Sequence, residues 1–252
     1  MARRFLLVFL VALAAMTLSA LADPIAKVVA VVGSPTSSGP GGNRTLAAGA
    51  DIFEKDKISV SSGNAQILFN DGTKLVVGPG STLVISAYLM QGDGSSAQDF
   101  SIKALRGTFR FITGKSPKNA YDIQTANATI GIRGTGFDFW VQNATGVAVL
   151  KGKVRLCNKL GSKACVDLNP NCEIGTTENG GAKKLTDGNL ASRLKGRLPY
   201  ILNQSSLKTQ FRLNVETCKN VQTNSTTPDR SLEREDKKRD NSVPTPPKRG
   251  VP

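Results

Sequence analysis

Four cysteines carry the clearest chemistry in this sequence: Cys157, Cys165, Cys172 and Cys218. Their spacing includes no C-x2-C pair of the kind that binds zinc, and an even number of cysteines in an exported chain is typical of disulfides. The residues just before Cys157 and just after Cys165 alternate like two strands joined by a turn-prone loop. Of the three possible pairings, we therefore expect Cys157–Cys165 as a cross-strand bridge, with Cys172–Cys218 tying the C-terminal region to the rest.

Histidine is absent from the chain. Its absence removes the usual general base at neutral pH, the Ser-His and Cys-His nucleophile pairs and the commonest zinc ligand. Asp51, Glu54 and Asp56 lie close enough in sequence to bind a cation, but they lack the regular ligand order of a calcium loop. We therefore predict no enzyme, no cofactor and no metal site.

The N-terminal residues predict export. Arg3 and Arg4 precede an apolar run over 5–18, and small residues follow at Ala20 and Ala22. This pattern is typical of a cleavable signal peptide over 1–22, since a membrane span needs about 20 apolar residues. We expect a periplasmic or secreted protein with no membrane span after cleavage.

The chain is strongly basic, with 33 Lys and Arg against 19 Asp and Glu and a net charge of +14. This balance suits an anionic partner, either an envelope protein or an anionic cell-surface polymer. Nucleic acid is not expected, because one Trp and three Tyr offer few side chains for stacking on bases. The candidate residues for anion or partner contacts are Arg106, Arg133, Lys183, Lys184, Arg193, Lys195 and Arg197. For Arg106 and Arg133, repeated placement beside Gly-Thr also fits bonds to loop carbonyls, a structural role that we favour.

The elements that must position these residues are short strands, separated by turns rich in Gly, Asn, Asp and Pro. We predict them at 27–32, 57–60, 65–69, 74–77, 82–87, 101–105, 107–112, 121–125, 128–132, 137–141, 147–150 and 153–157. About 10–12 short strands predict an all-β fold, either a β-solenoid or a sandwich. Phe109 and Phe111 share one face of their strand with Arg110 opposite, which predicts one packed face and one face in water. Phe137 and Phe139 flank Asp138 in the same way.

One motif occurs twice. Residues 105–111 and 132–139 both carry an apolar residue, then Arg-Gly-Thr, then two Phe separated by one residue. The second copy has an extra Gly136, which predicts a β-bulge.

The character of the chain changes after Gly175. Residues 187–195 and 205–219 are predicted to be helical. Asp187 or Asn189 could cap the first helix, and in the second Leu207, Phe211 and Val215 recur at i, i+4 and i+8. The polar, Pro-rich end of the chain is expected to be disordered. The predicted divisions are a signal peptide at 1–22, a β domain at 23–175, a basic and partly helical extension at 176–222, and a disordered tail at 223–252.

Residues 49–152 resemble the FecR domain of bacterial envelopes. The resemblance is carried mainly by Asp71-Gly72-Thr73, Gly78-Pro79-Gly80-Ser81 and Ile132-Arg133-Gly134-Thr135-Gly136-Phe137. It implies an all-β, periplasmic, non-catalytic module. In the regulator branch of the family, such a domain meets an outer-membrane receptor and signals through a membrane helix to a sigma factor. This chain has neither a cytoplasmic N-terminal region nor an internal membrane helix, so we expect a stand-alone exported FecR-domain protein.

The resulting prediction is a non-catalytic binding or scaffold protein that recognises an envelope protein or an anionic glycan. The alternative is a signalling component that acts with a separate membrane partner. An enzyme acting on polysaccharide would need two carboxylates about 5–10 Å apart in a cleft.

Overall fold

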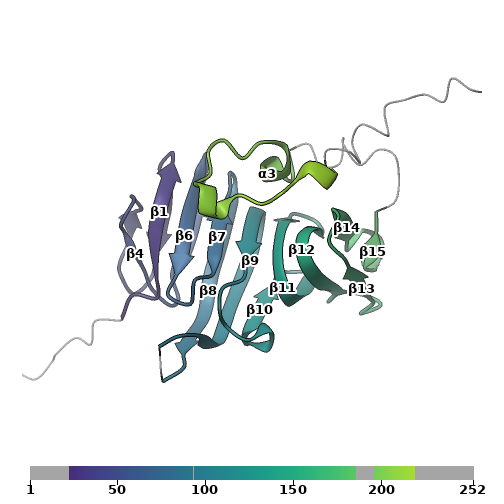
Figure 1. The fold of residues 1–252 in the computed structure, drawn as a ribbon, viewed down its shortest axis with the longest axis horizontal. Helices are drawn as coiled ribbons and strands as arrows, with labels where there is room; N and C mark the ends of the chain where they lie inside the picture. The colour runs from purple at the N-terminus through teal and green to yellow at the C-terminus, as the bar shows by residue number, and fades with distance from the viewer. Residues whose placement is uncertain (1–22, 93, 186–195, 219–252) are drawn as a thin grey trace, which may run out of the picture.

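The computed structural model describes residues 23–92, 94–185 and 196–218 (Figure 1). The predicted signal peptide, the predicted helix at 187–195 and the predicted tail at 223–252 lie outside these ranges. The described strands are β1 (Ala26–Val32), β2 (Thr36–Ser38), β3 (Arg44–Thr45), β4 (Asp51–Ile52), β5 (Lys57–Val60), β6 (Asn64–Phe69), β7 (Lys74–Val77), β8 (Ser81–Met90), β9 (Ala97–Ile112), β10 (Tyr121–Gln124), β11 (Ala128–Val141), β12 (Thr145–Asn158), β13 (Cys165–Leu168), β14 (Glu173–Thr176) and β15 (Lys183–Lys184). The described helical elements are α3 (Pro199–Leu202) and the 3-10 turns η1 (Lys118–Ala120), η2 (Glu178–Gly180) and η3 (Thr209–Phe211).

The all-β prediction is confirmed, and the pairing shows one continuous sheet folded into two facing layers. The first half of β9 pairs with β8 and β10, whereas its second half pairs with β7 and β11. β11 changes neighbour in the same way, from β10 to β9, and β12 changes from β14 to β13. The first layer therefore runs β4-β1-β6-β7-β9-β11-β12-β14-β15. The second runs β3-β2-β5-β8-β9-β10-β11-β12-β13. Of the two architectures predicted, this is the sandwich.

Aromatic side chains join the two layers in a single core. The Phe69 ring, from β6 in the first layer, lies 4.5 Å from the Phe100 ring in the second. Phe100 in turn lies 5.8 Å from Phe111 in the first layer. These contacts belong to one buried cluster that spans both layers. The core is thus the space between the layers, as in other sandwiches.

Three glycines mark the bends at which the long strands pass between layers. Gly107, Gly134 and Gly152 have φ values of 105°, 65° and 74°, a region that other residues rarely adopt. In β9 the side chains that belong to the shared core are even-numbered before Gly107, as Ile102 and Ala104, and odd-numbered after it, as Phe109 and Phe111. The repeated Arg-Gly-Thr motif is therefore the bend sequence of β9 and β11. The register also shifts at Gly136, as the bulge prediction requires.

The predicted strands are placed correctly, but three predicted breaks are wrong. Segments 101–105 and 107–112 form the single strand β9, and β11 and β12 likewise each join two predicted strands. A glycine with positive φ predicts a turn. Here it bends the strand without ending it, because the backbone continues to pair with a neighbour on each side of the bend.

Residues 196–218, here called the strap, lie across the outer face of the first layer (Figure 1). Tyr200, Leu207 and Phe211 of the strap pack on Val76 of β7. Leu198 and Ile201 belong to a second cluster with Trp140 of β11. The strap therefore adds a third, irregular layer.

The helix predicted for 205–219 does not form over 205–215, and within the part of that range that the structure describes only residues 216–218 are α-helical. Leu207, Phe211 and Val215 are buried as expected, but only the 3-10 turn η3 forms between Leu207 and Val215. Two glutamine side chains form hydrogen bonds with backbone groups of the strap, in place of the backbone hydrogen bonds of a helix. Gln66 Oε1 accepts from Lys208 N at 2.8 Å, and Gln204 Nε2 donates to the Leu213 carbonyl at 2.8 Å. The apolar spacing reflects contact with the sheet, because tertiary packing outweighs helix propensity here.

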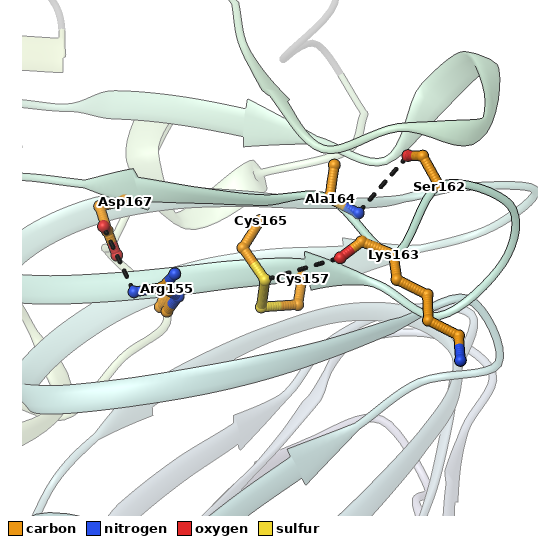
Figure 2. The surroundings of a disulfide bond; sticks show 7 residues. All are labelled: Arg155, Cys157, Ser162, Lys163, Ala164, Cys165 and Asp167. Carbon is orange, nitrogen blue, oxygen red and sulfur yellow. Dashed lines mark hydrogen bonds and ion pairs between the residues drawn. A yellow bond between two sulfur atoms is a disulfide. The ribbon is translucent and has the colours of Figure 1, made fainter.

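Both predicted disulfides are confirmed. Cys157 of β12 and Cys165 of β13 are direct cross-strand partners with Cα atoms 4.0 Å apart, beside the Arg155–Asp167 ion pair (Figure 2). Cys172 joins Cys218 at the end of the strap with Cα atoms 5.1 Å apart. The second bridge fixes the strap to the sheet.

Candidate functional site

A fully buried ion pair lies beneath the strap. Arg110 Nε donates to Asp138 Oδ1 at 2.6 Å and Arg110 Nη2 donates to Asp138 Oδ2 at 2.8 Å, with both side chains 0% exposed. The face predicted to be in water is therefore covered, and that expectation for Arg110 and Asp138 is wrong. The strap is the reason, because it packs over the sheet at this point.

The same guanidinium holds the strap. It donates to the Tyr200 carbonyl at 3.1 Å, to the Phe211 carbonyl at 3.4 Å and to the Gln204 side chain. Burial raises the pKa of Asp138, and the adjacent Arg110 guanidinium opposes this rise. Arg110 and Asp138 together form a structural latch, because all the hydrogen bonds described for the Arg110 guanidinium are made to this protein.

A second buried polar cluster surrounds Asp71, in the predicted turn between β6 and β7. Its carboxylate accepts from Ser116 Oγ at 2.6 Å, from Thr73 Oγ1 at 2.8 Å and from the Tyr121 hydroxyl at 3.0 Å. Burial raises the pKa of Tyr121 and of Tyr88, whose hydroxyl accepts from Asp71 N. The cluster satisfies a buried carboxylate and fixes the turn.

The three acidic residues that the sequence offered as a cation site each form an ion pair with a basic side chain. Asp56 pairs with Arg44 at 2.5 Å, Asp51 with Lys27 at 2.6 Å, and Glu54 with its neighbour at 2.8 Å. Within the described ranges, no three His, Cys, Asp or Glu side chains gather as metal ligands would.

Two adjacent pockets lie where β11 turns into β12. They share four lining residues, Trp140, Gln142, Asn143 and Arg197. The first, the amide pocket, has a volume of about 420 Å³ and is completed by Asn127, Ala144, Asn158, Leu160, Thr177, Glu178 and Gly180. The second, the arginine pocket, has a volume of about 460 Å³ and is completed by Pro79, Gly80, Arg106, Gly107, Thr108, Val141 and Gly196. Both volumes fall in the range of small-molecule sites.

Arg197, at the start of the strap, stands between the two pockets. Its guanidinium carbon lies 5.5 Å from the centre of the Trp140 ring, within cation–π range. Its Nη1 donates to Glu178 Oε1 at 3.0 Å. The strap therefore supplies one wall of each pocket.

The structure separates the basic residues singled out in the sequence. Arg106 and Arg197 line the same pocket, while Arg133 is exposed at the β11 bend. Lys183 and Lys184 are exposed on β15, and Lys184 pairs with Glu173 at 2.8 Å. Although partial burial favours the neutral acid, hydrogen bonds from Lys184 and Asn169 leave the pKa of Glu173 lowered. The other two candidates, Arg193 and Lys195, lie outside the described residues.

Sequence analysis missed Trp140, Thr108, Gln142 and Asn143 as lining residues. The available indication was the only Trp of the chain standing just before a Gln-Asn turn. The contribution of the strap could not be inferred, because Arg197 is 57 residues away in sequence from the tryptophan that it covers.

Comparison with known proteins finds a family match for the central part of the chain. Residues 56–155 match the family described as FecR protein. Two crystal structures of a candidate anti-sigma factor from Parabacteroides distasonis also match, each with a TM-score of 0.41, at 19% and 20% identity. These matches cover 55% and 56% of this chain and 63% and 65% of the other chain, which is less than two thirds of its length. No curated protein matches the sequence. Across the part of the chain that the structure describes, no helix is both long and apolar enough to cross a membrane.

Proposed function

We propose that this FecR-domain protein is a non-catalytic binding or scaffold protein of the bacterial envelope, and that it recognises an envelope protein or an anionic surface polymer. The observation that carries the proposal is the FecR match over 56–155, which spans strands β5 to β11 and most of β12. The family is regulatory rather than catalytic, which supports a binding role.

The chemistry of the cysteines supports a location outside the cytoplasm. All four cysteines are paired, in two disulfides that persist only in an oxidising compartment. The FecR match points to the same compartment. The predicted signal peptide at 1–22 gives the route, and cleavage after Ala22 would leave a mature chain that begins at Asp23.

The charge distribution supports an anionic partner. Arg106, Arg133 and Lys183 are exposed, and none of them forms an ion pair with another described residue. Exposed cations attract anionic surfaces over a distance of about 10 Å at moderate salt, and added salt screens them.

Affinity capture from envelope extracts with residues 23–252 tests the proposal. We expect specific capture of an envelope protein or an acidic polymer, reduced at raised salt. Lys183→Gln with Lys184→Gln should weaken capture, whereas Lys103→Gln with Lys153→Gln, two exposed lysines in the second layer, should not. Capture of nothing beyond the background of an unrelated basic protein would contradict the proposal.

The second candidate is a signalling component that acts with a separate membrane protein. The FecR match favours it, because the family is regulatory. Chemical cross-linking in intact cells distinguishes the two. A specific cross-link to one integral membrane protein supports signalling, while cross-links to soluble envelope proteins or polymer alone support the scaffold role.

A further inference from the structure

We propose that the amide and arginine pockets together bind a small acidic sugar, with its carboxylate in the arginine pocket and its hydroxyl groups in the amide pocket. This inference deepens the proposed binding function, on which it rests, by naming the ligand chemistry of one site.

The arginine pocket suits a carboxylate. Arg106 and Arg197 both line it, and no acidic residue does. Arg106 forms no ion pair with any described residue, and the Nη2 and Nε atoms of Arg197 make no hydrogen bond with one. Two guanidinium groups beside one pocket can bind a carboxylate in the bidentate geometry that arginine favours.

Thr108 provides a second, independent indication of a ligand. It lines the arginine pocket, is 4% exposed, and its hydroxyl has no hydrogen-bond partner. A buried hydroxyl without a partner costs about 1–3 kcal/mol, so such groups are rare in folded proteins.

The amide pocket suits neutral hydroxyl groups. The side chains of Gln142 and Asn143 are exposed and make no hydrogen bond with other described residues, and each offers both donors and acceptors. Glu178 lines this pocket but not the other. The negative charge of its carboxylate, which pairs with Arg197, disfavours a ligand carboxylate in this pocket, so we place the acidic end of the ligand beside Arg106.

The site carries its own reporter. Trp140 is the only tryptophan of the chain and lines both pockets. Because Arg197 lies over its ring, a ligand that draws the guanidinium toward a carboxylate changes the surroundings of the indole. Tryptophan fluorescence of the full protein therefore reports occupancy directly.

The test is a titration of the mature protein with glucuronate, glucose and inorganic phosphate, followed by tryptophan fluorescence and by calorimetry. We expect saturable binding of glucuronate that is at least about tenfold tighter than that of either other probe. Glucose loses the charge-assisted hydrogen bonds to the arginines, and phosphate loses the contacts of the sugar hydroxyl groups with the amide pocket. Phosphate that binds as tightly as glucuronate would overturn the sugar assignment in favour of a general anion site. No binding of glucuronate by either method would overturn the proposal altogether.

Matched variants locate the site. Arg106→Gln should weaken glucuronate binding about tenfold or more. Arg133→Gln, the same change at the equivalent position of the second Arg-Gly-Thr motif, should leave it unchanged. An equal effect of both would place the binding elsewhere.

Asn143→Ala should weaken binding of glucuronate but not of acetate, which lacks hydroxyl groups. If the protein still captures envelope components but does not bind glucuronate, the sugar site is rejected and the proposed function stands.

Discussion

Arg110 and Asp138 illustrate what single residues determine in this protein. Each lies between two inward-facing Phe residues of its strand, and together they form a directly opposed cross-strand pair. Their burial depends on residues 90 to 101 positions away from Arg110 in sequence, which bond its guanidinium from the strap. A pair buried in this way is costly to split, because the remaining charge has no compensating partner.

The first prediction concerns that pair. Asp138→Asn should lower the free energy of unfolding by about 3–5 kcal/mol, since it leaves the Arg110 charge buried and uncompensated. Urea denaturation followed by tryptophan fluorescence measures the change.

The exposed pair of Arg155 and Asp167 supplies the control, because it too joins directly opposed residues of adjacent strands. Asp167→Asn should change stability by no more than about 0.5 kcal/mol. An Asp138→Asn protein as stable as this control would contradict the latch.

The bent strands set the architecture at the scale of elements. Gly152 is packed most tightly of the three bend glycines, because a Cβ atom there would lie 2.0 Å from the Gly134 carbonyl oxygen. At Gly134 the nearest atom to such a Cβ is the flexible end of Lys118, at 3.4 Å. The bends of β11 and β12 thus touch each other at these two glycines.

We predict that Gly152→Ala destabilises the protein by more than about 2 kcal/mol, from positive φ and steric overlap combined. Gly72→Ala is the matched control, since Gly72 has a similar φ of 82° with open space around it. It should cost only about 1–2 kcal/mol. Thermal unfolding of the two variants checks the ranking, and equal costs would show that the bends do not pack as described.

The sequence predicts these elements in part. Alternation places strands such as β5 and β7 at their observed bounds, because one face of each strand packs on the core. The same logic fails where the strap covers the other face, so Arg110 and Asp138 were expected in water. It fails again at 205–215, where a helical spacing of apolar residues arises from an irregular segment that packs on a sheet. Alternation and spacing report local burial, but they do not show which distant segment provides the cover.

The second disulfide belongs to this scale as well. Cys172 and Cys218 enclose a sequence separation of 46 residues, compared with 8 for Cys157 and Cys165. The chain-entropy model therefore predicts a loss of about 4 kcal/mol for Cys172→Ser with Cys218→Ser, and about 2.5 kcal/mol for the other pair.

Amide hydrogen exchange tests more specifically whether the Cys172–Cys218 disulfide stabilises the strap. Without the Cys172–Cys218 bridge, amides of the strap such as Leu207 and Phe211 should lose protection before those of β6 and β7. Uniform loss of protection across the sheet and the strap would show that the bridge does not act locally.

At the scale of the whole molecule, all three tyrosines of the chain are buried, namely Tyr88, Tyr121 and Tyr200. Burial raises the pKa of each above its ordinary value of 10.0. A raised pKa in the folded state gives stability that is present below pH 10 and is lost as the pH rises above it.

We therefore predict that tyrosinate forms only as the protein unfolds in alkali. Near-ultraviolet absorbance should show no tyrosinate in the native protein at pH 10, followed by one cooperative rise that coincides with loss of tertiary structure. A gradual titration centred near pH 10 in the folded protein would contradict the burial of these side chains.

The central claim is that the strap is an integral layer of the fold, packed on the first layer and fixed to the sheet by the Cys172–Cys218 bridge. Peptide mapping under non-reducing conditions, on protein isolated from cells that produce it naturally, tests this claim most directly. The account predicts two linked pairs, Cys157 with Cys165 and Cys172 with Cys218, and no free thiol. Free thiols at Cys172 and Cys218, or an exchange of partners between the two pairs, would contradict it.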